Sequence, residues 1–142
     1  MDKNEAKRHA QDIIDSNKVG VLATIEGNKP HSRYMTFYND NFTLLTPTSS
    51  KTHKAEEIEK NSNVHILLGY DGEGYGDAFV EISGKAVIRH DQETKEKVWT
   101  DSVQSWLGSP DNPEYIVLEI QPDSIRLMNS KGDTPEEIDF SS

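Results

Sequence analysis

Four basic side chains that could bind an anion lie close together in a chain that is otherwise strongly acidic. They are Arg33, Lys51, His53 and Lys54, and the 142-residue sequence carries a formal net charge of -10. Arginine and lysine bind phosphate groups through charge-assisted hydrogen bonds. The cluster therefore predicts a phosphate site, and the alternative is an ordinary solvated loop that leads into a helix.

A hydroxyl-rich segment precedes the last of these basic residues. Thr48, Ser49, Ser50 and Thr52 lead into a short helix expected to end near residue 60, and Lys54 falls in its first turn. The free N–H groups and the positive dipole end of a helix N-terminus favour anions. The segment lacks Walker glycines and so is not a P-loop. Alternatively, Ser50 or Thr52 only caps the helix.

Arg33 falls in the middle of a strand expected over residues 31–38. Period-two alternation places it on the same face as Met35 and Phe37. An unpaired guanidinium is costly to bury. Arg33 therefore needs an anionic partner, which is either a ligand or one of the 25 aspartates and glutamates of the chain.

The rest of the chain divides into short elements that would position this cluster. Ala6, Ala10, Ile13 and Ile14 follow helical spacing. We expect helices over 2–17 and 91–107, and strands over 19–25, 31–38, 42–46, 64–70, 78–90, 115–121 and 124–128. Gly27-Asn28 indicates a hairpin turn and Gly84 a bulge.

These elements predict an α+β fold with an antiparallel sheet of about six strands that closes into a barrel. We expect one domain over residues 1–142, with residues 1–17 as an N-terminal helix. Residues 129–142 are polar and acidic, and we expect them to form a flexible tail.

Composition excludes several classes of function. The chain has no cysteine, so a redox role would need a bound cofactor. Its acidity argues against nucleic acid as a partner. No apolar run is long enough to span a membrane, and no signal-like segment is present, so we expect a cytoplasmic protein. The spacing of the five histidines predicts no metal site.

Two stretches carry an ordered set of motifs. ATIEGNKPHSRYMTFY and LLTPTSSKTHKAEEIEKNSNVHILLGY contain Gly27, Pro30, Arg33 with Met35, Thr48 with Ser49, Lys54, Ile58, Asn61 and Val64. The later stretch VWTDSVQSWLGSPDNPEYIVLEIQPDSIRLM adds two tryptophans, a Gly-x-x-Asp-x-Pro loop and a closing hairpin. Over roughly residues 5–128, this order resembles the pyridoxamine 5′-phosphate oxidase-like FMN-binding split barrels, and within them the general stress protein 26 group.

The resemblance implies a six-stranded split barrel with flanking helices, which forms a homodimer with the flavin at the subunit interface. It implies that Arg33 and Lys54 hold the FMN phosphate and that Trp106 comes from the partner subunit. The alternative is that Trp99 and Trp106, at i, i+7 spacing, are core residues. The other implied contacts are Ser49, Thr52 and His53 around the phosphate, the backbone of Tyr34, Met35 and Thr36 at the isoalloxazine edge, and Thr48 near the ribityl chain or ring edge. FAD or a deazaflavin in place of FMN, and Lys51 in place of Lys54, stay open.

The resemblance implies an FMN-dependent oxidoreductase acting on a small molecule, with the flavin doing the redox chemistry and no required catalytic side chain. The alternative is a non-catalytic flavin binder, carrier or sensor in the stress response. True pyridoxamine 5′-phosphate oxidases have an Arg-x-His segment near the C-terminus, and a lysine where this chain has Tyr38. This chain ends in KGDTPEEIDFSS, so oxidation of vitamin B6 is disfavoured.

Overall fold

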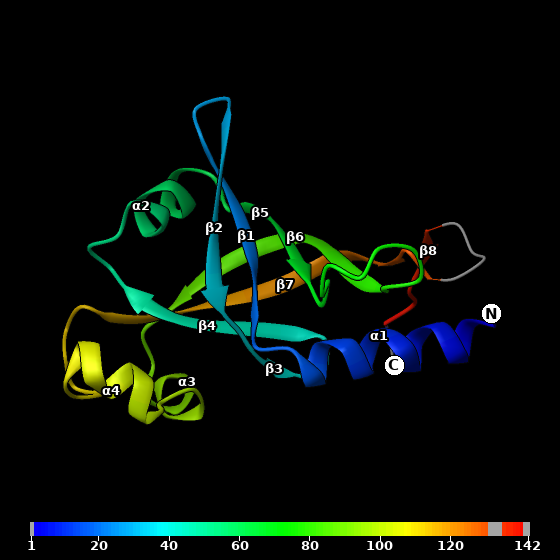
Figure 1. Ribbon diagram of the computed structural model, residues 1–142. Helices are drawn as coiled ribbons and strands as arrows, with labels where there is room; N and C mark the ends of the chain where they lie inside the picture. The colour runs from blue at the N-terminus through cyan, green and yellow to red at the C-terminus, as the bar shows by residue number, and fades with distance from the viewer. Residues whose placement is uncertain (1, 131–134, 141–142) are drawn as a thin grey trace.

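The computed structural model describes residues 2–130 and 135–140 as an antiparallel sheet curled into a half-barrel with flanking helices (Figure 1). The helices are α1 (Lys3–Ser16), α2 (His53–Lys60), α3 (Gln92–Lys97) and α4 (Asp101–Leu107). The strands are β1 (Val19–Glu26), β2 (Lys29–Thr36), β3 (Tyr38–Asp40), β4 (Thr43–Ser49), β5 (Asn63–Leu68), β6 (Phe79–Arg89), β7 (Tyr115–Met128) and β8 (Glu136–Glu137). Within these described ranges no helix is long and apolar enough to cross a membrane.

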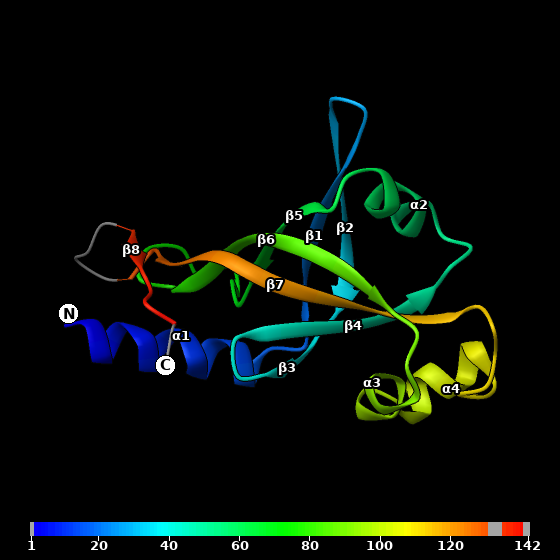
Figure 2. The same cartoon turned by 180° about the vertical axis from the view of Figure 1, so that it is seen from behind.

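The strands pair in the order β2-β1-β5-β6-β7-β4-β3, with β8 added to β7. The two long strands β6 and β7 run side by side through the length of the molecule (Figure 2). The β1–β2 hairpin projects beyond the sheet and turns at Gly27, whose φ of 64° is the left-handed conformation that glycine adopts freely (Figure 1). β2 lies at one end of the strand order, so one of its backbone edges is free of sheet pairing.

The expected bulge at Gly84 is confirmed, because the pairing of β6 with β7 shifts register between Ser83 and Gly84. A Cβ at position 84 would lie 2.4 Å from the carbonyl oxygen of Gln121, which explains why glycine is needed there. The extra residue is Asp123 on β7, which lies between the partners of Ser83 and Gly84 and helps the sheet to curl.

The main core lies between the concave face of the sheet and α1. Ala6, Ala10 and Ile14 on α1 are buried, as the helical spacing predicts. Ala55 and Ile58 attach α2 to the same core. A second apolar cluster, which contains Leu45, Val98, Val103, Leu107, Tyr115 and Val117, attaches α3 and α4 to β4 and β7.

The number of strands differs from the expected six, since the described residues form eight. The strand expected over 31–38 divides at Phe37, whose side chain is 1% exposed, because residues up to Thr36 pair with β1 whereas residues from Tyr38 pair with β4. The strands expected over 115–121 and 124–128 form one strand, β7, because the bulge at Gly84 lets the pairing continue past Pro122.

The helix expected over 91–107 is also two helices. Thr100 interrupts it in an extended conformation, and its Oγ1 accepts a hydrogen bond from the Val103 N–H at 3.3 Å. Threonine is a favoured N-cap residue, and here Thr100 starts a second helix within a stretch whose apolar spacing predicts a single helix.

In the segment 129–142, for which we expect a flexible tail, residues 135–140 contact the core, while residues 131–134 and 141–142 lie outside the described residues. Ile138 is 3% exposed and its N–H donates to the carbonyl of Ile125 at 2.8 Å. Phe140 packs against Phe42 with a ring-centroid separation of 6.2 Å. Two apolar side chains in an acidic segment are sufficient to attach it to the core.

Candidate functional site

A groove of about 370 Å³ lies between β2, the loop that follows β4, the start of α2, and α4. Seven of the ten residues that the sequence singled out line this groove: Tyr34, Met35, Thr36, Thr48, Thr52, Lys54 and Trp106. Val19, Tyr38, Pro47, Ser102 and Val103 complete the lining. The groove therefore joins residues from four separate parts of the sequence.

The N-terminus of α2 faces this groove and has no side-chain cap. Thr52 occupies the N-cap position, but its hydroxyl donates to the carbonyl oxygen of Ser49 at 2.8 Å and makes no cap hydrogen bond. The expectation that Ser50 or Thr52 caps this helix is confirmed for the position of Thr52, but its side chain does not form the capping hydrogen bond. By contrast, side chains cap the N-termini of α1, α3 and α4. The first-turn N–H groups of α2 can therefore bind a ligand.

Lys54 is the second residue of α2 and is half-buried against the groove. Within residues 2–130 and 135–140, no carboxylate forms an ion pair with it. Burial lowers the pKa of Lys54, and the positive charge of Arg33 lowers it further. A negatively charged group in the groove would relieve both effects. Lys51, the other candidate, is exposed and does not line the groove.

Arg33 is paired with a carboxylate of the chain itself, which is the alternative that the sequence left open. Its Nη2 donates to Oε2 of Glu57 at 3.2 Å, and its Nη1 donates to Oγ1 of Thr24 at 2.7 Å. Arg33 does not line the groove. Its charge nevertheless acts on Lys54, so the two cations lie near each other as the sequence predicts.

Glu57 is the central residue of this network and was not identified from the sequence. It lies on α2 and is only 5% exposed. Its Oε2 accepts hydrogen bonds from Thr24 and Arg33, and its Oε1 lies 2.6 Å from Nδ1 of His31. The Thr24 hydrogen bond is the largest of the effects that lower the pKa of Glu57. The hydrogen bond from His31 and the charge of Arg33 add to it, against the effect of burial.

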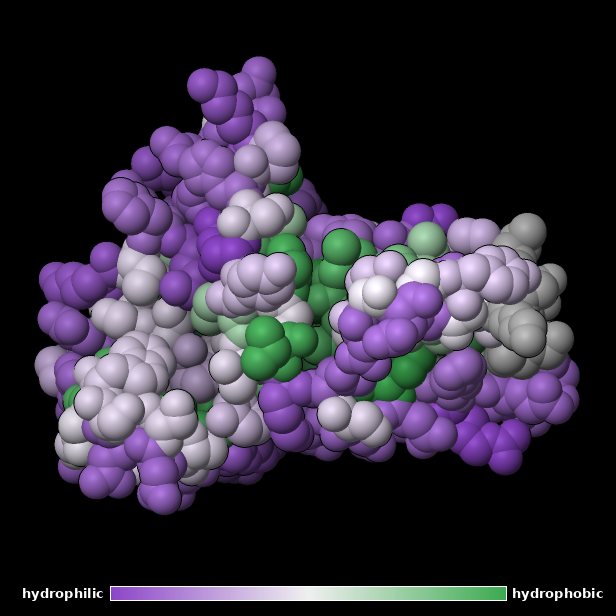
Figure 3. Space-filling view, in the orientation of Figure 1, coloured by the Kyte–Doolittle hydropathy of each residue, from purple (hydrophilic) through white to green (hydrophobic). Residues whose placement is uncertain are grey.

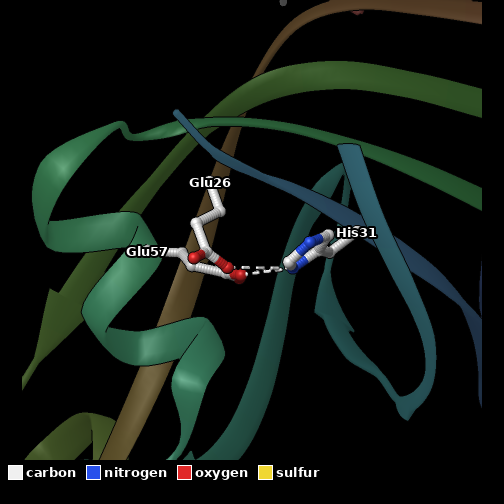
Figure 4. Close-up of side chains that lie close together, drawn as sticks. All are labelled: Glu26, His31 and Glu57. Carbon is white, nitrogen blue, oxygen red and sulfur yellow. Dashed lines mark hydrogen bonds and ion pairs between the residues drawn. The ribbon is translucent and has the colours of Figure 1, made fainter. Parts of the chain in front are cut away.

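His31 has a second acidic neighbour at the end of the β1–β2 hairpin. Oε2 of Glu26 lies 3.5 Å from the same Nδ1 atom. Figure 4 shows the carboxylates of Glu26 and Glu57 approaching one ring nitrogen of His31. His53 does not line the groove but faces a neighbouring cavity, whose lining also includes Glu26 and Glu57.

The remaining predicted residues are placed as follows. Ser49 lies beside the groove, and its Oγ accepts a hydrogen bond from the Lys51 N–H at 3.1 Å. Trp106 is 51% exposed and lies along the groove of its own chain. Trp99 instead packs on Tyr115 with a ring-centroid separation of 5.3 Å, consistent with a core role.

Apolar surface is uncovered close to the groove. Val19 on β1 and Leu67 on β5 are 60% and 39% exposed, and Figure 3 shows hydrophobic surface near the middle of this face, over β1 and β5. Tyr34, which lines the groove, is 78% exposed.

Comparison with known proteins gives a consistent result along nearly the whole chain. The family model described as pyridoxamine 5′-phosphate oxidase matches residues 6–129. General stress protein 26 of Bacillus subtilis (strain 168) is 52% identical over 140 residues, which cover 99% of this chain and 100% of that protein.

Two solved structures share both sequence and fold with this chain. General stress protein 26 from Bacillus anthracis str. Sterne is 35% identical, with a TM-score of 0.83 over 93% of this chain and 96% of that one. A protein from Listeria innocua described as a putative pyridoxamine 5′-phosphate oxidase is 39% identical, with a TM-score of 0.78 over 87% and 98%.

Proposed function

Because this chain belongs to the pyridoxamine 5′-phosphate oxidase family, we propose that it binds FMN in the groove and acts as an FMN-dependent oxidoreductase on a small molecule. The observation that carries the proposal is Lys54, a half-buried cation that faces the groove and has no carboxylate partner among the described residues. It stands at the one helix N-terminus of the described chain that lacks a side-chain cap.

The phosphate end of the flavin would bind at this point. The Lys54 ammonium and the free first-turn N–H groups of α2 supply donors and positive charge, and both strengthen hydrogen bonds to an anion. Arg33 contributes its charge from behind, where Glu57 and Thr24 hold its guanidinium. In this proposal Lys54 contacts the phosphate directly, and Arg33 adds positive charge without contacting it.

The ring end of the flavin would lie along β2. This strand is an edge of the sheet, and we assign its backbone around Tyr34, Met35 and Thr36 to the ring edge, where the Thr36 carbonyl already accepts a hydrogen bond from the Thr46 hydroxyl. The side chains of Tyr34 and Trp106 border the groove and offer aromatic surface to the ring. Thr48 also lines the groove and would contact the ribityl chain or the ring edge.

A second copy of the chain would complete the site. The groove is open on one side, and apolar side chains such as Val19 and Leu67 are exposed next to it. Covering them with a second subunit would remove apolar area from water and shield the ring. We therefore propose a homodimer with the flavin at the interface, in which Trp106 contacts the flavin of its own chain, of the partner or of both.

Bound FMN would supply hydride or electron transfer. None of the described residues that line the groove carries a carboxylate or an imidazole, so the role of this chain would be to anchor the phosphate, orient the ring and limit access of water. The same features suit a non-catalytic flavin carrier or sensor. Oxidation of vitamin B6 stays disfavoured, because Tyr38 lines the groove at the position where true pyridoxamine 5′-phosphate oxidases have a lysine.

Titration of the purified protein with FMN and with riboflavin, followed by flavin fluorescence, tests the phosphate site. We expect tighter binding of FMN than of riboflavin, and a loss of about ten-fold or more in FMN affinity, about 1.4 kcal/mol, in Lys54→Met. The matched control Lys51→Met should change FMN affinity less than two-fold, roughly 0.4 kcal/mol.

Two results would contradict this assignment. The first is a protein that does not bind FMN, and the second is a Lys54→Met variant that keeps the full preference for FMN over riboflavin. If FMN binds, oxidation of NADH or NADPH by the loaded protein then separates an oxidoreductase from a carrier. Size-exclusion chromatography with light scattering tests the dimer, and FAD in place of FMN tests the choice of flavin.

A further inference from the structure

A histidine and two glutamates from three different elements converge beside the β1–β2 hairpin, outside the groove. We propose that Glu26, His31 and Glu57 bind a divalent transition metal ion of the Zn²⁺ type. This site does not depend on flavin binding.

The donor atoms are already within reach of one ion. Nδ1 of His31 and one oxygen from each glutamate all lie within 4.8 Å of one another (Figure 4). The His31–Glu26 distance of 3.5 Å is close to the ligand–ligand spacing of about 3.4 Å that tetrahedral Zn²⁺ requires for bonds near 2.1 Å. The His31–Glu57 distance of 2.6 Å would widen by about 0.8 Å, within the reach of two side-chain rotations.

The charge balance of the cluster also calls for a cation. Oε2 of Glu57 is satisfied by Thr24 and Arg33, but its Oε1 faces His31. Glu26 has His31 as its one ion-pair partner within the described residues. A proton on Nδ1 can donate to one of these carboxylates at a time, whereas a metal ion binds both oxygens and the nitrogen together.

The elements that carry the three donors are held by the fold. Glu26 and His31 lie on opposite strands of one hairpin, and Glu57 is fixed on α2 by its hydrogen bonds to Thr24 and Arg33. Such outer contacts orient metal ligands and tune their basicity. Three protein ligands leave a coordination position for water or another small ligand.

The adjoining cavity gives this open position access to solvent. The cavity has a volume of about 620 Å³, and Glu26 and Glu57 contribute to its lining. His53 also lines this cavity. A nitrogen donor together with carboxylates favours Zn²⁺ and similar ions over Mg²⁺ and Ca²⁺, which prefer oxygen donors alone.

A second histidine–glutamate pair on the sheet provides the matched control. Nε2 of His65 lies 3.6 Å from Oε2 of Glu81, and Arg126 pairs with the same carboxylate. One carboxylate and one arginine leave no uncompensated negative charge there. His65→Ala therefore removes an equivalent imidazole without affecting the proposed site.

Isothermal titration calorimetry with ZnCl₂ and MgCl₂, on untagged protein first treated with a chelator, tests the proposal. We expect one Zn²⁺ per chain and no comparable Mg²⁺ binding. His31→Ala and Glu26→Gln should each weaken Zn²⁺ binding about ten-fold or more, since loss of an outer contact alone costs about 10–100-fold. Glu26 is exposed, so its variant tests the site without disturbing the core.

Co²⁺ as a probe adds a spectroscopic readout, because a Co²⁺ ion bound by nitrogen and oxygen has visible absorption bands that depend on its ligands. We expect these bands to be lost in His31→Ala and kept in His65→Ala. The proposal is overturned if Zn²⁺ does not bind, if His31→Ala and Glu26→Gln bind it like the unsubstituted protein, or if His65→Ala weakens binding equally.

Discussion

Substitution of Glu57 by glutamine is the change that most directly tests the network behind the groove. Glutamine keeps the shape of the side chain but removes the charge that Arg33 pairs with. Glu57 is 5% exposed, whereas the Arg33 and His31 side chains are 25% and 42% exposed. The substitution therefore leaves a partly solvated guanidinium without its carboxylate partner.

The expected loss of stability follows from the hydrogen bonds involved. Hydrogen bonds to a charged group contribute about 1.5–3 kcal/mol each, and removal of one partner of a fully buried pair costs about 3–5 kcal/mol. Glutamine retains part of the bonding and Arg33 is partly solvated, so we expect a loss of about 2–3 kcal/mol in the free energy of unfolding. For a chain of this size that corresponds to a fall of about 6–10 °C in Tm.

The pH dependence provides a second and more specific readout. The pKa of Glu57 in the folded protein lies below its ordinary value of 4.5, so the folded state binds the proton less readily than the unfolded state. The stabilisation from the charged carboxylate is then present above about pH 4.5 and is lost as the pH falls through the lowered pKa. Urea unfolding at pH 7 and at successively lower pH should show the difference between Glu57 and glutamine shrinking toward acid.

The matched control is Glu56→Gln on the same helix. Glu56 is exposed and forms an i,i+4 pair with Lys60 at 3.5 Å, so its removal should change stability by less than about 0.5 kcal/mol. A chelator in all samples keeps a metal effect out of the comparison. The reasoning is refuted if Glu57→Gln is no more destabilising than Glu56→Gln, or if its effect is as large at pH 3 as at pH 7.

Three further substitutions test the packing that positions the groove. Tyr115 is fully buried, and its pKa is raised to about 12, first by burial and then by the negative charge of ionised Tyr38, so its contribution to stability should decline as the pH rises above 10. Tyr115→Phe should lower the free energy of unfolding by about 1 kcal/mol at pH 7, because the hydrogen bond to the Lys95 carbonyl is lost. A variant whose alkaline unfolding matches that of the unsubstituted protein would contradict this. Gly84→Ala should lower the free energy of unfolding in urea by about 2–3 kcal/mol, because the new Cβ meets the Gln121 carbonyl. The control Gly72→Ala, at a φ of 84° with open space around it, should lower it by only about 1 kcal/mol. Equal effects would mean that the close approach of Gly84 to Gln121 is unimportant. Ile138→Ala should cost about 2–4 kcal/mol by calorimetry, and a cost near zero would mean that the C-terminal segment does not stabilise the core.

Local patterns in the sequence predicted most of the elements that build the sheet. The amphipathic spacing of α1, the turn at Gly27 and the bulge at Gly84 all agree with the structure, because helical periodicity and glycine conformation are properties of a few neighbouring residues. The divided strand at Phe37 and the cap at Thr100 were missed. At Phe37 the chain changes from pairing with β1 to pairing with β4, and at Thr100 a side-chain cap starts a new helix.

The acidic composition concealed the attachment of the C-terminal segment. Residues 136–140 read as polar, yet Ile138 and Phe140 pack on the core beside strand β8. An isolated apolar residue is buried only if the fold places other apolar side chains against it. The residues adjacent to it in the sequence do not specify those distant partners.

The basic cluster shows most clearly what the sequence determined by itself. Charge, hydroxyl content and helix phase were sufficient to place Lys54 in the first turn of α2 and to predict that Arg33 needs an anion. The identity of that anion was decided by tertiary structure, since Glu57 reaches Arg33 and His31 only when α2 packs on the β1–β2 hairpin. Periodicity describes which way a side chain points along its own element, and it carries no information on which of 25 acidic side chains lies opposite. For that reason the sequence located the basic cluster, and the fold alone brought Glu26, His31 and Glu57 together beside it.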